Sequence, residues 1–281
     1  MSQAATEERR AQLDREGWCV VPDVIGRDEA AAAHRRVWSV IEANRRDGIT
    51  TELAGIDPNN RNVRALNLID GDPLFRDMIQ NETALEMVRA VIGPDFCISN
   101  FTANIALPGS GSMPLHSDQS FVAPQPWAQP WSVNIIWCLT DVHAANGATC
   151  FIPGSHHWRT RADVPADALS RLTPFEAKAG SIVVMEGRVW HTSGANVTAD
   201  EERCLLFGYY SVSFLRAQVN WNVALSEEVK AGMSQPMRAW LGLDLIPNVP
   251  AAFLIQEGVE EYATATVKAR EPVQFVPESK R

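Results

Sequence analysis

Beyond residue 95 the chain is a series of short apolar runs separated by Gly, Pro and Asn. These runs are rich in β-branched and aromatic residues, and they read FCISNFTANIALPG, WSVNIIWCLTDV, ATCFIPGS, GSIVVMEGRVWHTSG and RCLLFGYYSVSFLR. Many short strands with closely spaced turn signals favour a sandwich, a jelly roll or a barrel. Residues 96–220 are therefore predicted to form a β core.

The first 95 residues have a different pattern, with apolar residues at helical spacing. A charged helix is predicted from Ala4 to Glu16, and the short strand WCVV follows it. Arg27 to Arg46 reads as a long amphipathic helix, and Asp72 to Ile92 as one or two helices. Residues 50–66 read as a loop with a DPNN turn signal. We expect these helices to form a layer over residues 1–95 that packs on the β core.

The end of the chain returns to a helical pattern from Ser226 to Trp240 and then becomes irregular. Residues 221–281 are therefore predicted to be a C-terminal helix and tail. No internal repeat, low-complexity tract or linker interrupts the sequence. We expect one domain over residues 1–281, mainly β with a helical layer (α+β).

Charge and composition exclude several classes of function. The 25 Lys and Arg against 34 Asp and Glu give a net charge of −9, which argues against binding to nucleic acid or to an anionic membrane. No apolar run approaches the roughly 18–20 residues of a membrane span, and the ends resemble neither a secretory signal nor a lipidation motif. The five cysteines are widely spaced without a CxxC pair, which is typical of buried thiols in a reducing compartment. We expect a cytoplasmic protein.

The strongest candidate for chemistry is an HxD pair. His116 and Asp118 are two residues apart, so on a strand both side chains would point to one face and could reach one metal ion. His191, on a later β run, is the candidate third ligand. Two histidines and one carboxylate form the facial triad of Fe(II) oxygenases, which leaves positions open for a cosubstrate and O₂. The spacing alone also fits a loop histidine beside a capping Asp118, and a core histidine beside Trp190.

The surrounding sequence resembles the phytanoyl-CoA dioxygenase family of Fe(II)- and 2-oxoglutarate-dependent oxygenases. The similar segments occur in the family's order, and they are LHSDQ at 115–119, NIIWCLTDV at 134–142, NGATCFIPGSHHW at 146–158, VWHTSGAN at 189–196, and Arg203. This resemblance implies a double-stranded β-helix (jelly roll, cupin-like) with N-terminal helices packed on it.

The resemblance also implies roles for individual residues. His116, Asp118 and His191 match the family's iron ligands, and Arg203 matches the arginine that holds the distal carboxylate of 2-oxoglutarate. A guanidinium pairs bidentately with a carboxylate and stays charged. Without the resemblance, Arg203 reads equally well as an exposed strand residue or as one paired with Glu201 or Glu202. Three further positions match residues of the cosubstrate pocket and read equally well as ordinary strand residues: Thr149, Ser193 and Trp137.

One position departs from the family pattern. Some relatives have Gln three residues before the first iron-binding histidine, and here that position is Met113. Asn134 or Gln119 could take its place, or the place could be left empty.

The segment FVAPQPWAQPW, from Phe121 to Trp131, directly follows the HxD pair. Its three prolines and two tryptophans suggest a semi-rigid lid over the iron. Phe121, Trp127 and Trp131 are therefore candidate substrate contacts. Packing in the core is the alternative explanation for the tryptophans.

The predicted function is an Fe(II)- and 2-oxoglutarate-dependent dioxygenase that consumes O₂ and releases succinate and CO₂. The expected substrate is a small apolar or aromatic molecule, oxidised at a C–H bond by hydroxylation, desaturation, epoxidation or rearrangement. Two alternatives remain: a metal enzyme of the same fold that does not use 2-oxoglutarate, and a binding protein without turnover. The sequence indicates neither the oligomeric state nor the substrate's identity.

Overall fold

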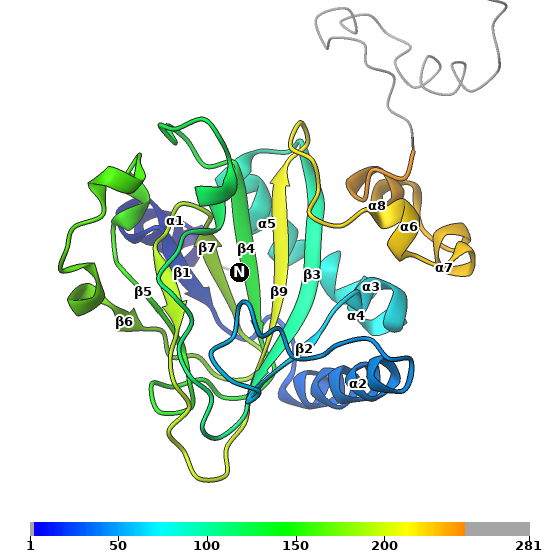
Figure 1. Cartoon of the computed structure of the whole chain (residues 1–281). Coiled ribbons are helices and arrows are strands. Elements are labelled where there is room, and N and C mark those ends of the chain that lie inside the picture. The colour runs from blue at the N-terminus through cyan, green and yellow to red at the C-terminus, as the bar shows by residue number, and fades with distance from the viewer. Residues whose placement is uncertain (1–2, 245–281) are drawn as a thin grey trace, which may run out of the picture.

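Two antiparallel β-sheets form the centre of the protein (Figure 1). The computed structural model describes residues 3–244. The larger sheet has the strand order β1-β7-β4-β9-β3-β2 and the smaller one β6-β5-β8. The strands are β1 (Trp18–Val21), β2 (Asn62–Ala65), β3 (Phe96–Ala106), β4 (Ser132–Cys138), β5 (Thr149–Phe151), β6 (Thr173–Pro174), β7 (Ile182–Glu186), β8 (His191–Ser193) and β9 (Arg203–Val212).

The strand order is that of a double-stranded β-helix, because from β4 to β9 the chain crosses repeatedly between the two sheets. β4 lies between β7 and β9, while β5 pairs with β8. Side chains from both sheets meet between them; the rings of Trp18 and Phe151, for example, have centroids 3.8 Å apart. The predicted jelly-roll core is confirmed.

Helices cover the other face of the large sheet and one end of it (Figure 1). The α-helices are α1 (Gln3–Glu16), α2 (Arg27–Arg46), α3 (Leu68–Gly71), α4 (Pro73–Ile79), α5 (Glu82–Ile92), α6 (Trp221–Ala224), α7 (Glu227–Ala231) and α8 (Gln235–Trp240). In α2 the buried residues recur every three or four positions, as the sequence predicts for an amphipathic helix: Ala30, Ala33, Val37, Val40 and Ile41.

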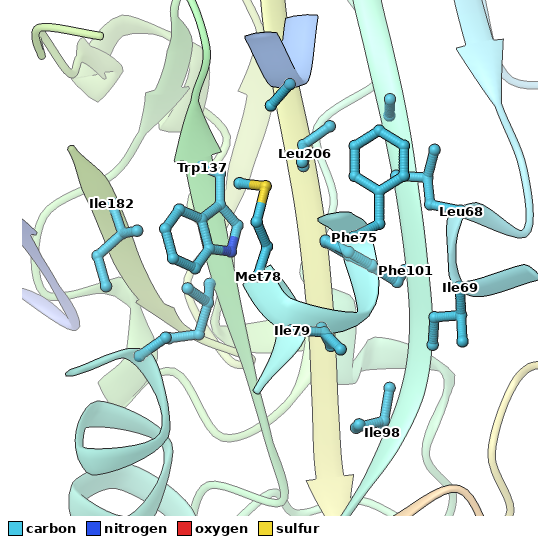
Figure 2. Close-up of a cluster of buried hydrophobic side chains, with 14 of the residues drawn as sticks. Leu68, Ile69, Phe75, Met78, Ile79, Ile98, Phe101, Trp137, Ile182 and Leu206 are labelled. Atoms are coloured by element: carbon cyan, nitrogen blue, oxygen red, sulfur yellow. The ribbon is translucent and has the colours of Figure 1, made fainter. Parts of the chain in front are cut away.

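The largest hydrophobic cluster, which we name the helix-side core, lies between these helices and the outer face of the large sheet (Figure 2). Trp137 of β4 belongs to it, beside Met78 of α4 and Ile182 of β7. The indole is fully buried there. The prediction that Trp137 lines the cosubstrate pocket is therefore wrong, since its side chain leaves the sheet on the side opposite the small sheet.

Several predicted boundaries also change. Residues 50–66 contain the strand β2, and the helix predicted from Ser226 to Trp240 is divided between α7 and α8 around Gly232. The predicted tail after Asp244 lies outside the described residues. Within residues 3–244 no helix combines the length and the hydropathy that crossing a membrane requires.

The five cysteines are free, and each is buried or half-buried. Burial raises the pKa of the Cys19 and Cys138 thiols to about 12, so both are protonated at neutral pH. This agrees with their prediction as small buried side chains.

Candidate metal centre and cosubstrate pocket

His116, Asp118 and His191 come together between the two sheets. One potential ligand atom from each lies within 4.8 Å of the others. The main chains of the two histidines pair directly: His116 N donates to His191 O at 3.0 Å, and His191 N donates to His116 O at 2.8 Å. The backbone itself thus brings two residues 75 positions apart to one place.

Both imidazoles are oriented by carbonyl groups two residues before them. His116 Nδ1 donates to Pro114 O at 2.9 Å, and His191 Nδ1 donates to Val189 O at 3.0 Å. These bonds leave the Nε2 lone pairs free to bind a metal ion. Burial and the neighbouring His116 lower the pKa of His191, so this imidazole is neutral at physiological pH.

Asp118 reaches the histidines from a different local structure than expected. It begins the short 3₁₀ helix η1 (Asp118–Phe121), so the predicted strand geometry of the HxD pair does not hold. Its Oδ1 lies 3.9 Å from His116 Nε2 and 3.8 Å from His191 Nε2. Three ligands of the expected types therefore surround one point, with a turn rather than the pleat of a strand placing the carboxylate.

Arg203 lies at the start of β9 with only 1% of its surface exposed. Its guanidinium donates to Gly147 O at 3.1 Å and to Asn104 Oδ1 at 3.2 Å. Within residues 3–244 no carboxylate lies within ion-pair distance of it. Burial lowers its pKa to about 10, so it is still charged at neutral pH. The predicted surface alternative for Arg203 is excluded, and a buried cation without an anion remains.

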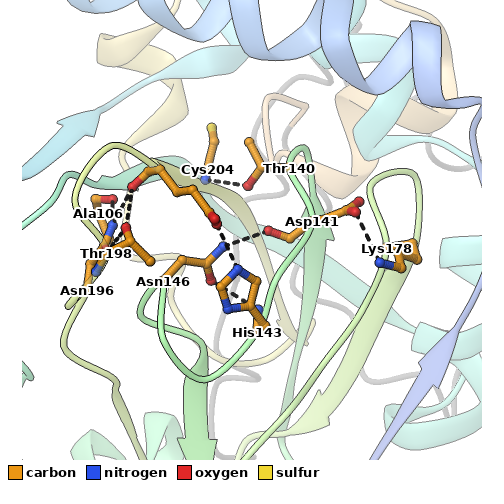
Figure 3. A network of polar contacts seen from close by, with 10 residues as sticks. Ala106, Thr140, Asp141, His143, Asn146, Lys178, Asn196, Thr198 and Cys204 are labelled. Atoms are coloured by element: carbon orange, nitrogen blue, oxygen red, sulfur yellow. Dashed lines mark hydrogen bonds and ion pairs between the residues drawn. The ribbon is translucent and has the colours of Figure 1, made fainter.

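Two asparagines close to Gly147, Asn146 and Asn196, hydrogen-bond to main-chain carbonyl groups (Figure 3). Asn146 Nδ2 donates to Asp141 O at 2.9 Å, and Asn196 Nδ2 donates to Ala106 O at 2.9 Å. Gly147 has φ +88°, and a Cβ on it would lie 3.1 Å from Gly194 O. The positive φ and this close approach explain why position 147 is a glycine. The carbonyl of the same glycine accepts the hydrogen bond from Arg203.

Thr149 and Ser193 are opposite each other in the register of β5 and β8, and His191 is two residues before Ser193 on the same face. This places both hydroxyl residues on the face that carries a metal-ligand candidate. Ser193 Oγ accepts a hydrogen bond from Met113 N at 3.0 Å. The predicted cosubstrate contacts of Thr149 and Ser193 stay predictions.

Two residues near Arg203 were missed at the sequence level. Asn104 and Arg64 are opposite each other in the pairing of β3 and β2. Asn104 is 5% exposed, and its Nδ2 is buried without a hydrogen-bond partner among the described residues. Arg64 forms a bidentate pair with Asp57, with both N–O distances 2.7 Å, and approaches Met113 Sδ at 3.5 Å.

The two proposed substitutes for the family's glutamine have other contacts. Gln119 hydrogen-bonds to the C-terminal end of the loop from Phe121 to Trp131. It donates to Gln129 O at 3.0 Å and accepts from Trp131 N at 2.8 Å. Asn134 Nδ2 donates to Asp118 Oδ2 at 3.1 Å. The guanidinium of Arg64 contacts the side chain of Met113, at Sδ.

The loop from Phe121 to Trp131 is anchored on the protein rather than free. Trp127 is fully buried beside Ile152 and Trp190, and its Nε1 donates to Val122 O at 2.8 Å. The prediction of a substrate contact is therefore wrong for Trp127, because its ring anchors the loop. Trp131 is half-buried, whereas Phe121 is 80% exposed.

The Trp127→Ala protein is expected to lose about 3–5 kcal/mol in the free energy of unfolding, the usual cost of removing a buried large aromatic side chain. Denaturant unfolding of the metal-free protein measures this. Phe121→Ala, which removes an exposed ring, serves as the control and is expected to unfold like wild type. Equal stability of the Trp127→Ala and wild-type proteins would contradict the anchoring role.

The chain is similar to one known protein family over most of its length. A model of the family described as "Phytanoyl-CoA dioxygenase (PhyH)" matches residues 13–204, which is more than half of the chain. The chain belongs to the phytanoyl-CoA dioxygenase family. This confirms the resemblance noted in the sequence, and with it the enzyme class, an oxidoreductase.

Individual members and solved structures extend the comparison. "Dioxygenase af480" of Aspergillus fumigatus is 44% identical over 266 residues, covering 94% of this chain and 86% of its own. HygX from Streptomyces hygroscopicus, solved with nickel and 2-oxoglutarate, aligns with a TM-score of 0.61 at 17% identity, over 77% of this chain and 89% of its own. The carbocyclase SnoK from nogalamycin biosynthesis aligns with a TM-score of 0.63 at 20% identity, over 79% and 88%. These two structures support the fold of this family member.

Proposed function

We propose that this family member is an Fe(II)- and 2-oxoglutarate-dependent dioxygenase that oxidises a C–H bond of a small, mainly apolar molecule. His116, Asp118 and His191 would hold Fe(II), and Arg203 would bind the distal carboxylate of 2-oxoglutarate. The observation that carries the proposal is the presence of both a three-ligand cluster and a buried arginine that has no carboxylate partner among residues 3–244. Neither feature stabilises the protein by itself, and together they fit a metal-bound 2-oxo diacid.

The donor set fits these groups. Two imidazoles and one carboxylate suit Fe(II), and three ligands leave coordination positions for a bidentate cosubstrate and O₂. The unpartnered Asn104 Nδ2 lies beside Arg203, so a carboxylate there would gain donors from both residues. HygX, of the same fold, holds nickel and 2-oxoglutarate. Bound iron would supply the activation of O₂, coupled to oxidative decarboxylation of 2-oxoglutarate to succinate and CO₂.

The protein's own residues would position the reactants. The carbonyls of Pro114 and Val189 fix the two imidazoles, so the ligand atoms are in place before a metal ion arrives. Arg203 would fix the far end of the cosubstrate and thereby its direction toward the ligand cluster. Its hydrogen bonds to Gly147 and Asn104 hold the guanidinium in place for this task. Thr149 and Ser193 are proposed to contribute hydroxyl groups to the same pocket.

Aromatic side chains on either side of the lid loop support an apolar substrate. Phe121 ends η1, only three residues from Asp118, and is 80% exposed. Phe214, in the segment after β9, is 71% exposed, and its ring centroid lies 6.1 Å from that of Trp131. An apolar molecule approaching the ligand cluster could cover these rings and so remove them from water.

The Phe121→Ala protein is expected to show a raised KM for the organic substrate, by about threefold to tenfold, and an unchanged KM for 2-oxoglutarate. Loss of contacts made equally in the ground and transition states appears in the substrate's own KM. Steady-state kinetics with each reactant varied in turn measure both constants. A parallel rise of both would mean that Phe121 shapes the iron site instead.

The decisive experiment for the reaction class is a substrate screen scored on succinate, with Fe(II), 2-oxoglutarate and O₂ present. Substrate-dependent succinate supports the proposal. O₂ uptake without succinate would indicate a metal enzyme of the same fold that does not use 2-oxoglutarate. Binding of a candidate substrate without O₂ uptake would indicate a protein that does not turn over.

The mass of the product together with its NMR spectrum then separates the possible oxidations, since mass gives the change in oxygen and hydrogen atoms and NMR gives the bonding. Hydroxylation and epoxidation change the oxygen count, desaturation removes two hydrogen atoms, and rearrangement changes the carbon skeleton or its connections. SnoK, a carbocyclase, shows that this fold is not restricted to hydroxylation. We further propose that residues 1–281 act as one domain in this reaction, in the cytoplasm.

A further inference from the structure

The two oxygen atoms of Asp118 have different surroundings. Oδ1 faces the Nε2 atoms of both histidines, at 3.9 and 3.8 Å. Oδ2 accepts a hydrogen bond from Asn134 Nδ2 at 3.1 Å. Without that donor, rotation about the bond between the Cβ and the carboxylate carbon would exchange the two oxygens freely. Asn134 therefore distinguishes one oxygen of the candidate ligand from the other.

Within the described part of the chain, Asp118 is the one hydrogen-bond partner of the Asn134 side chain. Asn134 is 6% exposed, and its own Oδ1 is buried without a hydrogen-bond partner among the described residues. Burying an amide with half of its hydrogen-bonding capacity unused costs free energy. All the other side chains of β4 are buried too, and five of the seven are Val, Ile, Trp or Cys. A β-branched residue would stabilise this strand better, so the amide is kept at a cost in stability.

A second side chain from the large sheet holds the main chain of the same ligand. Tyr209 Oη donates to Asp118 O at 3.3 Å. Tyr209 is opposite Asn134 in the pairing of β9 and β4. Adjacent side chains on one rigid sheet thus contact both the carboxylate and the carbonyl of Asp118, which itself lies in a short 3₁₀ helix.

We propose that Asn134 is a positioning residue for the metal centre, which holds Asp118 so that Oδ1 alone is presented to the ion. The inference rests on the proposed metal site. Asn134 would act in two ways: it prevents rotation of the carboxylate, and it donates to the oxygen that does not bind the ion. Residues that hydrogen-bond to metal ligands typically change metal affinity or activity by about 10- to 100-fold when removed.

The test is anaerobic titration of the metal-free protein with Co(II), without 2-oxoglutarate or substrate. Asn134→Leu replaces the amide by an apolar group of similar shape, and Asn134→Ala removes it. Both variants are expected to bind Co(II) about tenfold or more weakly than wild type. Their visible Co(II) bands are expected to shift, because a carboxylate free to rotate changes the ligand field. Thermal unfolding of the metal-free variants is expected to show no matching loss of stability.

Asn104→Ala is the matched control. Asn104 is also an asparagine on a central strand of the large sheet and is almost equally buried, but it contacts Arg203 instead of Asp118. This variant is expected to bind Co(II) like wild type, with an unchanged spectrum. Wild-type affinity and spectrum in either folded Asn134 variant would overturn the inference, as would equal weakening in Asn104→Ala.

The Asp118→Ala protein separates this inference from the proposed function. If wild type binds Co(II) and Asp118→Ala does not, the metal site stands, and the Asn134 variants test the positioning role alone. If wild type itself fails to bind Co(II), the proposed metal site falls, and the role of Asn134 falls with it. Tyr209→Phe, which removes one hydroxyl, is expected to weaken Co(II) binding less than Asn134→Leu, since it leaves the carboxylate contact in place.

Discussion

Asp118→Ala is expected to lower the affinity for Fe(II) by more than about a hundredfold. Removing a residue that only contacts a metal ligand typically costs about 10- to 100-fold, and here the ligand itself and its charge are lost. Only the two imidazoles remain, and burial lowers the pKa of His191, so no anionic ligand is left to hold the ion. Iron content after mild chelation and gel filtration measures the effect, and turnover should disappear with the metal.

Two other histidines provide the controls. His143 Nε2 is hydrogen-bonded to Glu201 at 2.7 Å, and His157 is exposed. His143→Ala and His157→Ala should therefore keep their iron and their activity. An Asp118→Ala protein that kept full iron and full turnover would refute the assignment of the three ligands, and so would iron loss in the two controls.

Arg203→Leu is expected to weaken binding of 2-oxoglutarate by about tenfold to several hundredfold while leaving Fe(II) binding intact. Charged hydrogen bonds contribute roughly 1.5–3 kcal/mol each, and a bidentate contact would lose two. The guanidinium is 1% exposed and has no carboxylate partner within residues 3–244, so water screens such a contact very little. Anaerobic titration of the charge-transfer band of the Fe(II)–2-oxoglutarate complex gives the Kd of each protein.

The loss of affinity in Arg203→Leu is expected to be specific for 2-oxo acids that carry a distal carboxylate. A 2-oxo acid without the distal carboxylate should lose little affinity in Arg203→Leu, because leucine leaves an apolar space where the charge was. Stability should change little, since a buried cation without an anion contributes little to folding. Arg216→Leu, at an exposed position after β9, is the control and should bind 2-oxoglutarate normally. An unchanged Kd in Arg203→Leu would direct the search to Arg64, the other arginine near Met113.

Trp137 was assigned to the wrong face of β4 because the burial of this strand hides the difference between its two faces in the sequence. All seven residues of β4 are buried, because helices cover one face and the small sheet covers the other. In such a strand the alternation of apolar and polar residues that reveals the two faces is lost. The polar Ser132 and Asn134 were the available markers: both lie on the inner face, so Trp137, three residues after Asn134, must lie on the outer face.

Some residues of the candidate site could be predicted from the sequence, and others could not. His116, Asp118, His191 and Arg203 could be predicted because they lie in segments with recognisable neighbours, such as VWHTSGAN. Asn104 and Arg64 could not, because their importance comes from pairing between β2, β3 and β9, which no local pattern records. For Trp127 the residue type was recognised but the burial was not. Whether an aromatic residue in a proline-rich loop faces solvent or the interior depends on contacts with distant residues such as Ile152.

The mutual hydrogen bonds between the main chains of His116 and His191 bear on what happens when the proposed centre loses its iron by oxidation. Since the backbone and two carbonyl groups already hold both imidazoles, folding does not have to wait for iron. A centre whose iron has been oxidised and lost would keep its ligands in register. With the proposed centre, such a molecule would recover by binding a fresh ferrous ion, without refolding or new synthesis, so one protein molecule could hold several metal ions in turn.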